Sequence, residues 1–461
     1  MITAHRVASI RELEAVAQED LPQGELMQRA AAGLAHALDD IPTGDLVIVL
    51  AGPGDNGGDG LYAAACLLDR GVRVDVARLD PDRVHEGGWD AACAAGAKVV
   101  DGPSGQPWCL DAMFGIGARP GLDGRAAEWA QWIADSGTRT IAVDVPSGID
   151  VDGGTTAERH VTAERTVTFG TYKIGLLVGP AADAAGRVDL VDIGVVPGDP
   201  DVEALDDGDG HLLTPALPGR SSHKYSRGVV GIAAGSLLYP GAAHLAVAGA
   251  QAGTAGMVRF GGDPAIADRV VDRAPEVVVG PGRVQAWVVG PGCGDDAKAL
   301  LAMTMADQVP VVVDADGLRF LKAPMSVPAV LTPHAGELAA MLGTDRAAVE
   351  QDPLRHAVAA AHGWNATVLL KGARTVVATP GRPIRVNLTG SPWLGTAGSG
   401  DVLAGFIGSL LASGLDPHDA ASIGAYLHGR AAEVCAGPLT ASDIAATLPL
   451  VITEWLAGSD G

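Results

Sequence analysis

Two glycine-rich segments of the chain carry acidic residues where they could take part in chemistry. The first, GPGDNGGDG at 52–60, follows the apolar run LVIVLA and has the G-x-G-x-x-G spacing of a dinucleotide-binding turn. Asp55 and Asp59, however, place two carboxylates where such a turn would hold a pyrophosphate. Three interpretations stay open: a tight strand-to-helix turn, an NAD-binding turn that Asp59 disfavours, or a site whose acids accept hydrogen bonds from a ligand's hydroxyl or amide groups.

The second segment, GTAGSGDVLAGFIGSLLASG at 395–414, is a glycine-rich turn that runs straight into an apolar helical pattern. The first N–H groups of a helix have no partner within the helix and its dipole favours an anion, so this turn can hold a phosphoryl group. Asp401 lies in the first turn, where it could take a proton from a hydroxyl that attacks phosphorus. The alternative is an ordinary helix start with an acid in its first turn.

Two further loops in the first half resemble the segment at 52–60 in composition. They are DAMFGIGARPGLDG at 111–124 and DVPSGID at 144–150, and each follows an apolar run. Asn56, Asp111 and Ser147 offer hard oxygen atoms from the three loops, which suits a cation such as K⁺ or Mg²⁺. For Asp144, which begins the loop at 144–150, the alternative is a helix or turn cap.

Short apolar runs alternate with helical stretches, and this pattern predicts an α/β protein with parallel sheets between helices. In the first half we expect strands at 46–51, 72–77, 98–101, 109–112, 140–144, 165–169 and 188–191. The acidic, glycine- and proline-rich segment at 197–210 has no periodicity and predicts a domain boundary. In an open parallel sheet, ligands bind beyond the carboxyl ends of the strands, which is where the three loops fall.

Composition limits the partners and the compartment. The chain has 461 residues, enough for two or three domains, and its net charge of −23 argues against nucleic acid or an anionic membrane as a partner. Five scattered cysteines without a C-x-x-C pair, together with an N-terminal sequence that lacks a secretory signal, predict a cytoplasmic protein.

The blocks in the first 195 residues, including LMQRAAAGLA near the start and TVTFGTYKIGLLVGPAADAAGRVDLVDIG at 166–194, occur in an order that resembles the NAD(P)H-hydrate epimerase domain of bifunctional NAD(P)H-hydrate repair enzymes. The resemblance implies a Rossmann-like domain over 1–206 and a K⁺ ion held by Asn56, Asp111 and Ser147. The residues it implies for substrate binding are Asp55, Asn56, Gly57, Gly58, Asp59, Gly115, Ile116, Gly117, Ala118, Arg119, Pro120, Gly121 and Asp144.

Epimerisation at the hydrated ring carbon requires the hydroxyl to leave and return, or the ring to open and close, and both routes need a proton donor and acceptor. Asp144 is the first candidate for this role. Lys173 is the second, and the alternative for Lys173 is a solvated lysine at a strand end. The family usually has Asn-Asn where this chain has Asp55-Asn56, so a neutral amide has become a carboxylate at 55.

From residue 221 on, the chain resembles the ADP/ATP-dependent NAD(P)H-hydrate dehydratases, which are ribokinase-like. The blocks that carry the resemblance include HKYSRGVVGIAAGS at 223–236, VVVDADGL at 311–318, LTPHAGELAAML at 331–342 and NLTGSPWLGTAGSGDVLAG at 387–405. The resemblance implies a domain over 211–461 with Asp401 as a catalytic residue. It also implies substrate contacts by Ala242, Gly292, His334 and Asp401, and adenine-nucleotide contacts by Lys371, Gly372, Ala373, Arg374, Thr375 and Gly400.

Two of these residues also have structural interpretations: His334 and Lys371 could simply be residues of a strand-end turn. In the same half of the chain, we expect Asp314 and Asp316 to cap helices. The family often has Asn where this chain has Ser391.

The implied function is therefore a two-domain repair enzyme. It would act on NADHX and NADPHX with ADP and Mg²⁺, form a homo-oligomer, and have no nucleic-acid or membrane partner. The sequence leaves open two other interpretations: a vitamin- or sugar-type kinase, or an N-terminal scaffold domain without activity. An NAD-dependent dehydrogenase is disfavoured by Asp59. The sequence does not decide between ADP and ATP, or between NADHX and NADPHX.

Overall fold

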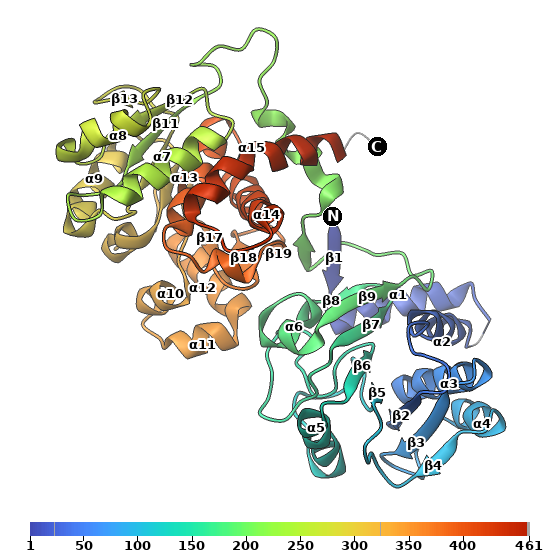
Figure 1. Cartoon of the computed structure of the whole chain (residues 1–461). Coiled ribbons are helices and arrows are strands. Elements are labelled where there is room, and N and C mark those ends of the chain that lie inside the picture. The colour runs from blue at the N-terminus through green and yellow to red at the C-terminus, as the bar shows by residue number, and fades with distance from the viewer. Residues whose placement is uncertain (23, 323, 459–461) are drawn as a thin grey trace. The chain divides into compact units, whose positions relative to one another are not determined.

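The computed structural model describes residues 1–22, 24–322 and 324–458 and divides the chain into two compact units. One unit is Thr3–Val202, and the other is Met1–Ile2 together with Glu203–Gly461. In each unit a largely parallel sheet lies between helices, which confirms the prediction of two three-layer α/β domains (Figure 1). The assignment of one activity to 1–206 and another to 211–461 stays a prediction. None of the described helices is long and apolar enough to span a bilayer.

The unit Thr3–Val202 is built on a seven-stranded sheet in the order β4-β3-β2-β5-β6-β7-β9. All of its strand pairs are parallel. The strands are β2 (Leu46–Ala51), β3 (Arg73–Arg78), β4 (Lys98–Val100), β5 (Trp108–Ala112), β6 (Arg139–Val143), β7 (Arg165–Phe169) and β9 (Arg187–Val191). These strands are mostly runs of apolar residues because helices cover both faces of the sheet.

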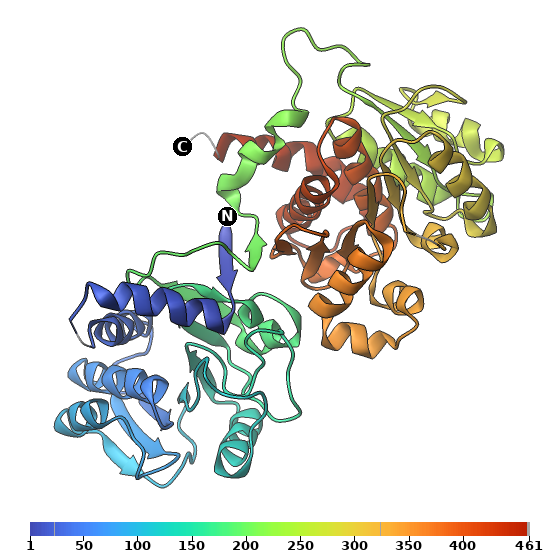
Figure 2. The ribbon, with the colours of Figure 1, turned by 180° about the vertical axis from the view of Figure 1, so that it is seen from behind.

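The helices of this unit divide between the two faces of the sheet. Residues of α2, α3 and α4 pack with one face, and residues of α5 pack with the other (Figures 1 and 2). The helices are α1 (Val7–Glu19), α2 (Glu25–Ala37), α3 (Asp55–Asp69), α4 (Glu86–Ala94), α5 (Gly124–Ser136) and α6 (Gly179–Ala185). A short parallel pair that the sequence pattern did not predict joins β1 (Ile2–His5) to β8 (Tyr172–Lys173).

In the second unit the strands run in the order β13-β12-β11-β14-β15-β16-β17-β18-β19. They are parallel from β13 to β17, whereas β18 and β19 are antiparallel. Their bounds are β11 (Val229–Ala233), β12 (Met257–Phe260), β13 (Val278–Val279), β14 (Ala286–Val289), β15 (Val311–Val313), β16 (Ala329–Leu331), β17 (Thr367–Leu370), β18 (Thr375–Ala378) and β19 (Ile384–Asn387).

The main core of the second unit lies between the sheet and α7, α13, α14 and α15. Helices α9 and α12 contact the strands β14 and β17 respectively. The helices are α7 (Pro240–Ala252), α8 (Ala267–Arg273), α9 (Ala297–Ala306), α10 (Ala335–Leu342), α11 (Arg346–Gln351), α12 (Pro353–Trp364), α13 (Ser399–Ala412), α14 (Pro417–Cys435) and α15 (Ala441–Gly458).

The segment predicted as a boundary, 197–210, contains regular structure. It includes β10 (Val202–Ala204) and the start of a 3-10 helix at Asp207–Ala216. The side chain of Asp206 caps this helix, and the Asp209 carboxylate accepts a hydrogen bond from the Asp206 N–H in return. Asp206 and Asp209 therefore form a capping box, a role that hydrophobic periodicity cannot reveal.

Helices α7 and α13 touch through their backbones. A Cβ atom on Gly249 would overlap the Val402 carbonyl oxygen, and one on Gly405 would overlap the Ala246 carbonyl oxygen. Glycine is therefore required at both positions, because any side chain would push the helices apart.

We expect Gly405→Ala to lower the free energy of unfolding of the second unit by about 1–3 kcal/mol, because the added methyl overpacks the α7–α13 contact. Urea unfolding of the full chain, followed by circular dichroism, measures the change. Gly363→Ala is the matched control: this glycine lies in α12 with open space around it, so alanine should stabilise by roughly 0.5–1 kcal/mol. Equal effects of the two substitutions would contradict the packing explanation.

Candidate functional site

The glycines at 52–57 allow the loop after β2 to pack tightly against the segment after β5. A Cβ atom on Gly52 would overlap the Met113 carbonyl oxygen, and one on Gly57 would overlap the Gly52 carbonyl oxygen. Gly54 has a φ of 110°, in the region that favours glycine. Close packing thus accounts for this glycine spacing without a bound pyrophosphate.

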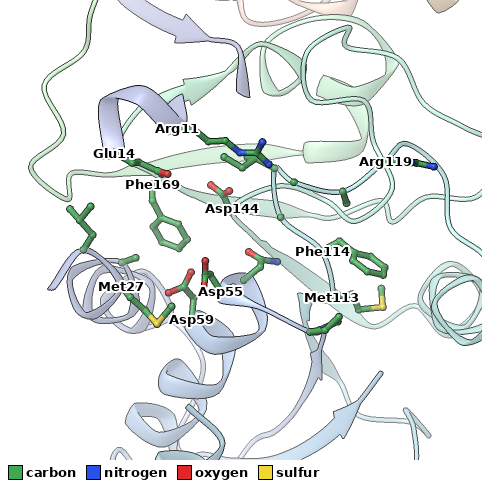
Figure 3. Close-up of a pocket in the computed structure, with 18 of the residues that line it drawn as sticks. Arg11, Glu14, Met27, Asp55, Asp59, Met113, Phe114, Arg119, Asp144 and Phe169 are labelled. Carbon is green, nitrogen blue, oxygen red and sulfur yellow. The ribbon is translucent and has the colours of Figure 1, made fainter. Parts of the chain in front are cut away.

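A cavity of about 940 Å³ opens beside this loop (Figure 3). Of the residues predicted to bind substrate, its wall contains Asp55, Asn56, Asp59, Gly115, Ile116, Gly117, Ala118, Arg119, Gly121 and Asp144. Gly57, Gly58 and Pro120 lie outside the wall. The first two pack beneath the loop instead, where a Cβ atom on Gly58 would lie 2.8 Å from the His85 ring.

Three elements contribute residues to the cavity that the sequence analysis did not single out. Arg11 and Glu14 come from α1, Met27 comes from α2, and Phe169 ends β7. Figure 3 shows Arg11, Glu14 and Phe169 across the cavity from Asp55 and Asp59, with Met27 beside Asp59. Within an amphipathic helix, Glu14 has the same pattern as any solvated acid, so no sequence signal separates it from one.

Asp144 is held in a fixed position by a buried lysine. The ammonium of Lys173 lies 2.6 Å from Asp144 Oδ1, and it also donates to Thr168 Oγ1 at 2.8 Å and to the Phe169 carbonyl oxygen at 2.9 Å. Thr168 in turn donates to Asp144 at 3.0 Å. Lys173 is 1% exposed and these three acceptors use its three hydrogens, so it contacts Asp144 from beneath the cavity rather than from its wall.

Asp144 also has an uncommon backbone conformation. Its φ is 64°, in the left-handed region that non-glycine residues rarely adopt. Such strain persists only where the surrounding structure imposes it, and it is concentrated at functional sites. Together with the Lys173 ion pair, this conformation points the Asp144 carboxylate into the cavity (Figure 3).

Asp59 differs from Asp144 in having no partner for one of its buried oxygens. The side chain is 8% exposed, and Oδ1 makes no hydrogen bond. Burial raises the pKa of Asp59 well above its ordinary value, and the carboxylates of Asp144, Asp55 and Glu14 raise it further. Burial likewise raises the pKa of Glu14.

The three predicted cation ligands lie around the segment that follows β5. Ser147 donates to Asp111 through Oγ at 2.7 Å and through its backbone N–H at 2.8 Å. The Phe114 N–H donates to Ser147 Oγ at 3.0 Å, and a Cβ atom on Gly115 would lie 3.2 Å from Asn56 Cβ. Burial raises the pKa of Asp111 to about 6, and both polar side-chain atoms of Asn56 are buried without a partner.

In the second unit, α13 begins with a glycine-rich turn, as predicted. Gly398 precedes the helix with a φ of 89°, and Asp401 lies in the first turn. The ammonium of Lys371, at the end of β17, would lie 3.3 Å from a Cβ atom on Gly400. A positive charge therefore lies next to the free N–H groups of this helix, which favours an anion there.

Lys371 is held at this point by Asp314. Its ammonium lies 2.8 Å from Asp314 Oδ1, and the Asp314 side chain is almost fully buried. Burial lowers the pKa of Lys371, but Asp314 and other nearby carboxylates more than offset this, so the pKa is raised. Burial, with a further contribution from Asp314, raises the pKa of Asp401 to about 7.

This contact corrects the expected role of Asp314. The residue precedes the 3-10 helix Ala315–Phe320, but its side chain makes no capping hydrogen bond and pairs with Lys371 instead. Asp316 likewise accepts a hydrogen bond from the Gly294 N–H outside that helix, at 2.8 Å. Asp314 and Lys371 are 57 positions apart in the chain, and only the parallel sheet brings them together.

The other predicted residues of this unit fall into small groups. Gly292 packs on Ala242, where a Cβ atom would lie 2.6 Å from the alanine methyl group. His334 caps α10 through Nδ1 and has an exposed side chain, and its backbone forms a bridge with Lys371. The remaining predicted nucleotide contacts, Gly372, Ala373, Arg374 and Thr375, form the turn into β18 and its first residue.

We expect Lys173→Met to lower the free energy of unfolding by about 3–5 kcal/mol, because it leaves the Asp144 carboxylate without its buried counter-charge. Adding Asp144→Asn to this variant should restore part of the loss, and a double-mutant cycle of urea unfolding measures the coupling. Glu164→Gln breaks the exposed Arg139–Glu164 pair of the same unit and should change stability little. Additive effects at 144 and 173 would contradict the pairing.

Comparison with known proteins gives a separate match for each half of the chain. A family model described as NAD(P)H-hydrate dehydratase matches residues 230–452, and one described as YjeF-related protein N-terminus matches residues 23–175. A crystal structure of ADP/ATP-dependent NAD(P)H-hydrate dehydratase from Bacillus subtilis is 29% identical, with a TM-score of 0.50, over 53% of this chain and 96% of that chain. A ribokinase-like superfamily protein from Enterococcus faecalis is 23% identical and has the same fold, with a TM-score of 0.50 over 56% of this chain and 98% of its own.

Two curated relatives match almost the whole chain. The bifunctional NAD(P)H-hydrate repair enzyme Nnr of Mycobacterium leprae is 41% identical over 95% of both chains. The protein of the same name from Moorella thermoacetica is 33% identical over 98% of this chain and 96% of its own. These similarities confirm the family predicted from the sequence blocks: the chain belongs to the bifunctional NAD(P)H-hydrate repair enzymes.

Proposed function

We propose that the chain repairs hydrated NADH and NADPH in two steps, one in each unit. The unit Thr3–Val202 interconverts the R and S forms of NADHX and NADPHX. The second unit dehydrates the S form and converts ADP to AMP and phosphate. The observation that carries the second step is the meeting of Asp401, Lys371 and Asp314 at the N-terminus of α13.

Each group at α13 has a role in phosphorylating the hydroxyl of the hydrate. Asp401 accepts the hydroxyl proton as the oxygen attacks phosphorus, and a pKa of about 7 suits a base at neutral pH. The free N–H groups of α13 and the Lys371 ammonium face the charge of the transferring phosphoryl group. Phosphate is then a far better leaving group than hydroxide, so its departure with a ring proton restores the dihydronicotinamide.

The second unit fits a divalent cation that enters with the nucleotide. The B. subtilis dehydratase was co-crystallised with ATP and Mg²⁺. Among the described residues, no three His, Cys, Asp or Glu side chains form a group that could hold a metal, which suits Mg²⁺ because it is usually bound through substrate phosphates. The choice of ADP as donor rests on the family resemblance.

The cavity of the first unit suits epimerisation because it brings carboxyl groups to one ligand-sized space. Asp144 is its fixed proton acceptor, and Lys173 positions Asp144 without reaching the substrate. Asp55, Asn56 and the loop at 115–121 supply polar contacts to the ring's hydroxyl and amide groups. This proposal gives the acids of the glycine-rich loop a substrate to bind in place of a pyrophosphate.

We also propose that Asn56, Asp111 and Ser147 hold a K⁺ ion. All three offer oxygen ligands. Two features favour a cation between them: Asn56 Oδ1 is buried without a partner, and the carboxyl of Asp111 is fully buried. K⁺ would supply the counter-charge for Asp111 and fix the loop that lines the cavity. A cytoplasmic location is supported by five cysteines that form no disulfide, whereas a homo-oligomer stays a prediction from the sequence.

The function is tested by the recovery of NADH absorbance from a mixture of R and S NADHX with ADP and Mg²⁺. We expect wild type to convert the whole mixture faster than spontaneous epimerisation allows, and Asp401→Asn to convert none. The wild-type dehydration rate should fall as the pH drops below about 7, because protonated Asp401 cannot accept the hydroxyl proton.

Recovery that stops at the S fraction would contradict epimerisation. No recovery with either ADP or ATP would contradict the repair function and favour a small-molecule kinase.

The cation proposal predicts that epimerisation depends on K⁺. Replacing KCl by choline chloride at equal ionic strength should slow epimerisation roughly tenfold or more, because Asp111 loses its buried counter-charge. Chromatographic separation of R and S NADHX over time measures the rate. Dehydration of purified S NADHX by the same preparation controls for general effects of the salt. Equal epimerisation rates in the two salts would remove the cation from the proposal.

A further inference from the structure

Among the carboxylates that line the cavity of the first unit, Asp59 is distinguished by a buried oxygen that has no partner. Asp59 Oδ1 is completely buried and makes no hydrogen bond with any described residue, although the side chain lies in the cavity wall (Figure 3). The nearby Asp144 is satisfied by Lys173 and Thr168. A buried, unpaired carboxylate oxygen is costly, so the structure favours a protonated Asp59 or one whose partner is a ligand.

The charges around Asp59 also favour its protonated form. Glu14 approaches from α1, Asp55 precedes it on α3, and Asp144 follows β6, so three other carboxyl groups face it. Lys173, whose charge lowers the pKa of Asp59, is paired with Asp144. Burial and these neighbours together raise the pKa of Asp59 well above its ordinary value.

We propose that Asp59 is a catalytic residue of the epimerase step: its carboxylic acid donates the proton with which the hydroxyl leaves, and Asp144 accepts the proton of the water that returns. This inference rests on the epimerase function proposed above and assigns the acid and the base within it. The two carboxyl groups differ in their partners: Asp144 has the buried ammonium of Lys173, whereas Asp59 Oδ1 has no partner. This difference assigns the base role to Asp144 and the acid role to Asp59.

The proposed step balances without any further reactant. In the hydrated ring, the carbon that bears the hydroxyl is bonded to the ring nitrogen. The hydroxyl oxygen takes the Asp59 proton, the C–O bond breaks with its electron pair on oxygen, and the nitrogen lone pair forms a C=N bond as water leaves. Water then adds to the other face of that carbon, the C=N pair returns to nitrogen, and Asp144 takes the released proton. The proton returns from Asp144 to Asp59 through water in the cavity.

The ring is a cation between loss and return of water, and this accounts for the acidic character of the site. Glu14, Asp55 and Asp144 line the space in which that charge develops. Fixed carboxyl groups in a site shielded from bulk water stabilise a developing positive charge without having to reorganise. A cavity that held pyrophosphate at this loop would require the opposite charge.

Asp59→Asn tests the assignment, because the amide keeps the shape of the side chain but cannot give up a proton. We expect the epimerisation kcat to fall by about 10²–10⁴-fold with little change in KM. In wild type the rate should decline at high pH as Asp59 loses its proton, and this decline should be absent from the variant's residual activity. The infrared difference spectrum between wild type and variant at neutral pH should contain the carbonyl stretch of a protonated carboxylic acid.

The matched control is Asp75→Asn. Asp75 is a buried aspartate of β3 that accepts a hydrogen bond from Gln106 at 2.8 Å and lies outside the cavity wall. An asparagine there can still accept this bond, so epimerisation should stay at the wild-type rate. Thermal melting of both variants shows whether either substitution unfolds the unit.

Two outcomes overturn the inference. A folded Asp59→Asn variant that retains most of the wild-type kcat would show that Asp59 gives no proton, as would the absence of the carboxylic-acid signal. In either case wild type still epimerises NADHX, so the proposed function stands. A wild type that does not epimerise NADHX would instead remove the proposed function and the inference with it.

Discussion

The sites in both units depend on one constraint: the carboxyl ends of parallel strands lie beside the start of a helix, and a glycine with a positive φ precedes that helix. Parallel strands bring their carboxyl ends to the same edge of a sheet, so loops far apart in the chain meet there. Glycine makes the turn possible at Gly54 before α3 and at Gly398 before α13. Asp59 and Asp401 both lie in the early turns of the helices that follow.

The starts of α3 and α13 favour ligands of opposite charge. At α13 a lysine reinforces the positive end of the helix dipole, so the site favours the negative charge of a phosphoryl group. At α3, acids from α1, α3 and the loop after β6 surround the helix start, so the site favours a positive charge. The same local fold therefore does not determine the ligand; the side chains that neighbouring elements bring to it do.

Much of this could be predicted from the sequence, because it depends on local patterns. The seven strands of the first sheet lie within one residue of the expected ranges, since fully buried parallel strands are continuous apolar runs. The start of α13 with Asp401 in its first turn was predicted by its glycine-rich turn and helical periodicity. The capped 3-10 helix at Asp207–Ala216 was missed because its signal is a pair of aspartates and not a periodicity.

The pairings across the sheet could not be predicted. Asp314 looked like a helix cap. It pairs with Lys371 only because β15 and β17 flank β16 in the sheet, so that the ends of these two strands lie close together. Glu14 has the pattern of any surface acid on an amphipathic helix, and its place in the cavity depends on how α1 packs over the sheet edge. Lys173 was expected at a strand end, where it lies, but its complete burial follows from the tertiary structure.

The glycine contact between α7 and α13 has a consequence for how this protein tolerates change over evolutionary time. Ala242 lies near the start of α7 and Asp401 near the start of α13, and the two helices meet through backbone atoms at Gly249 and Gly405. A contact between backbones contains no rotamers, so exchange of apolar side chains elsewhere in the core cannot alter the spacing of the helices at that point. The core can thus change in sequence while the distance between Ala242 and Asp401 stays the same.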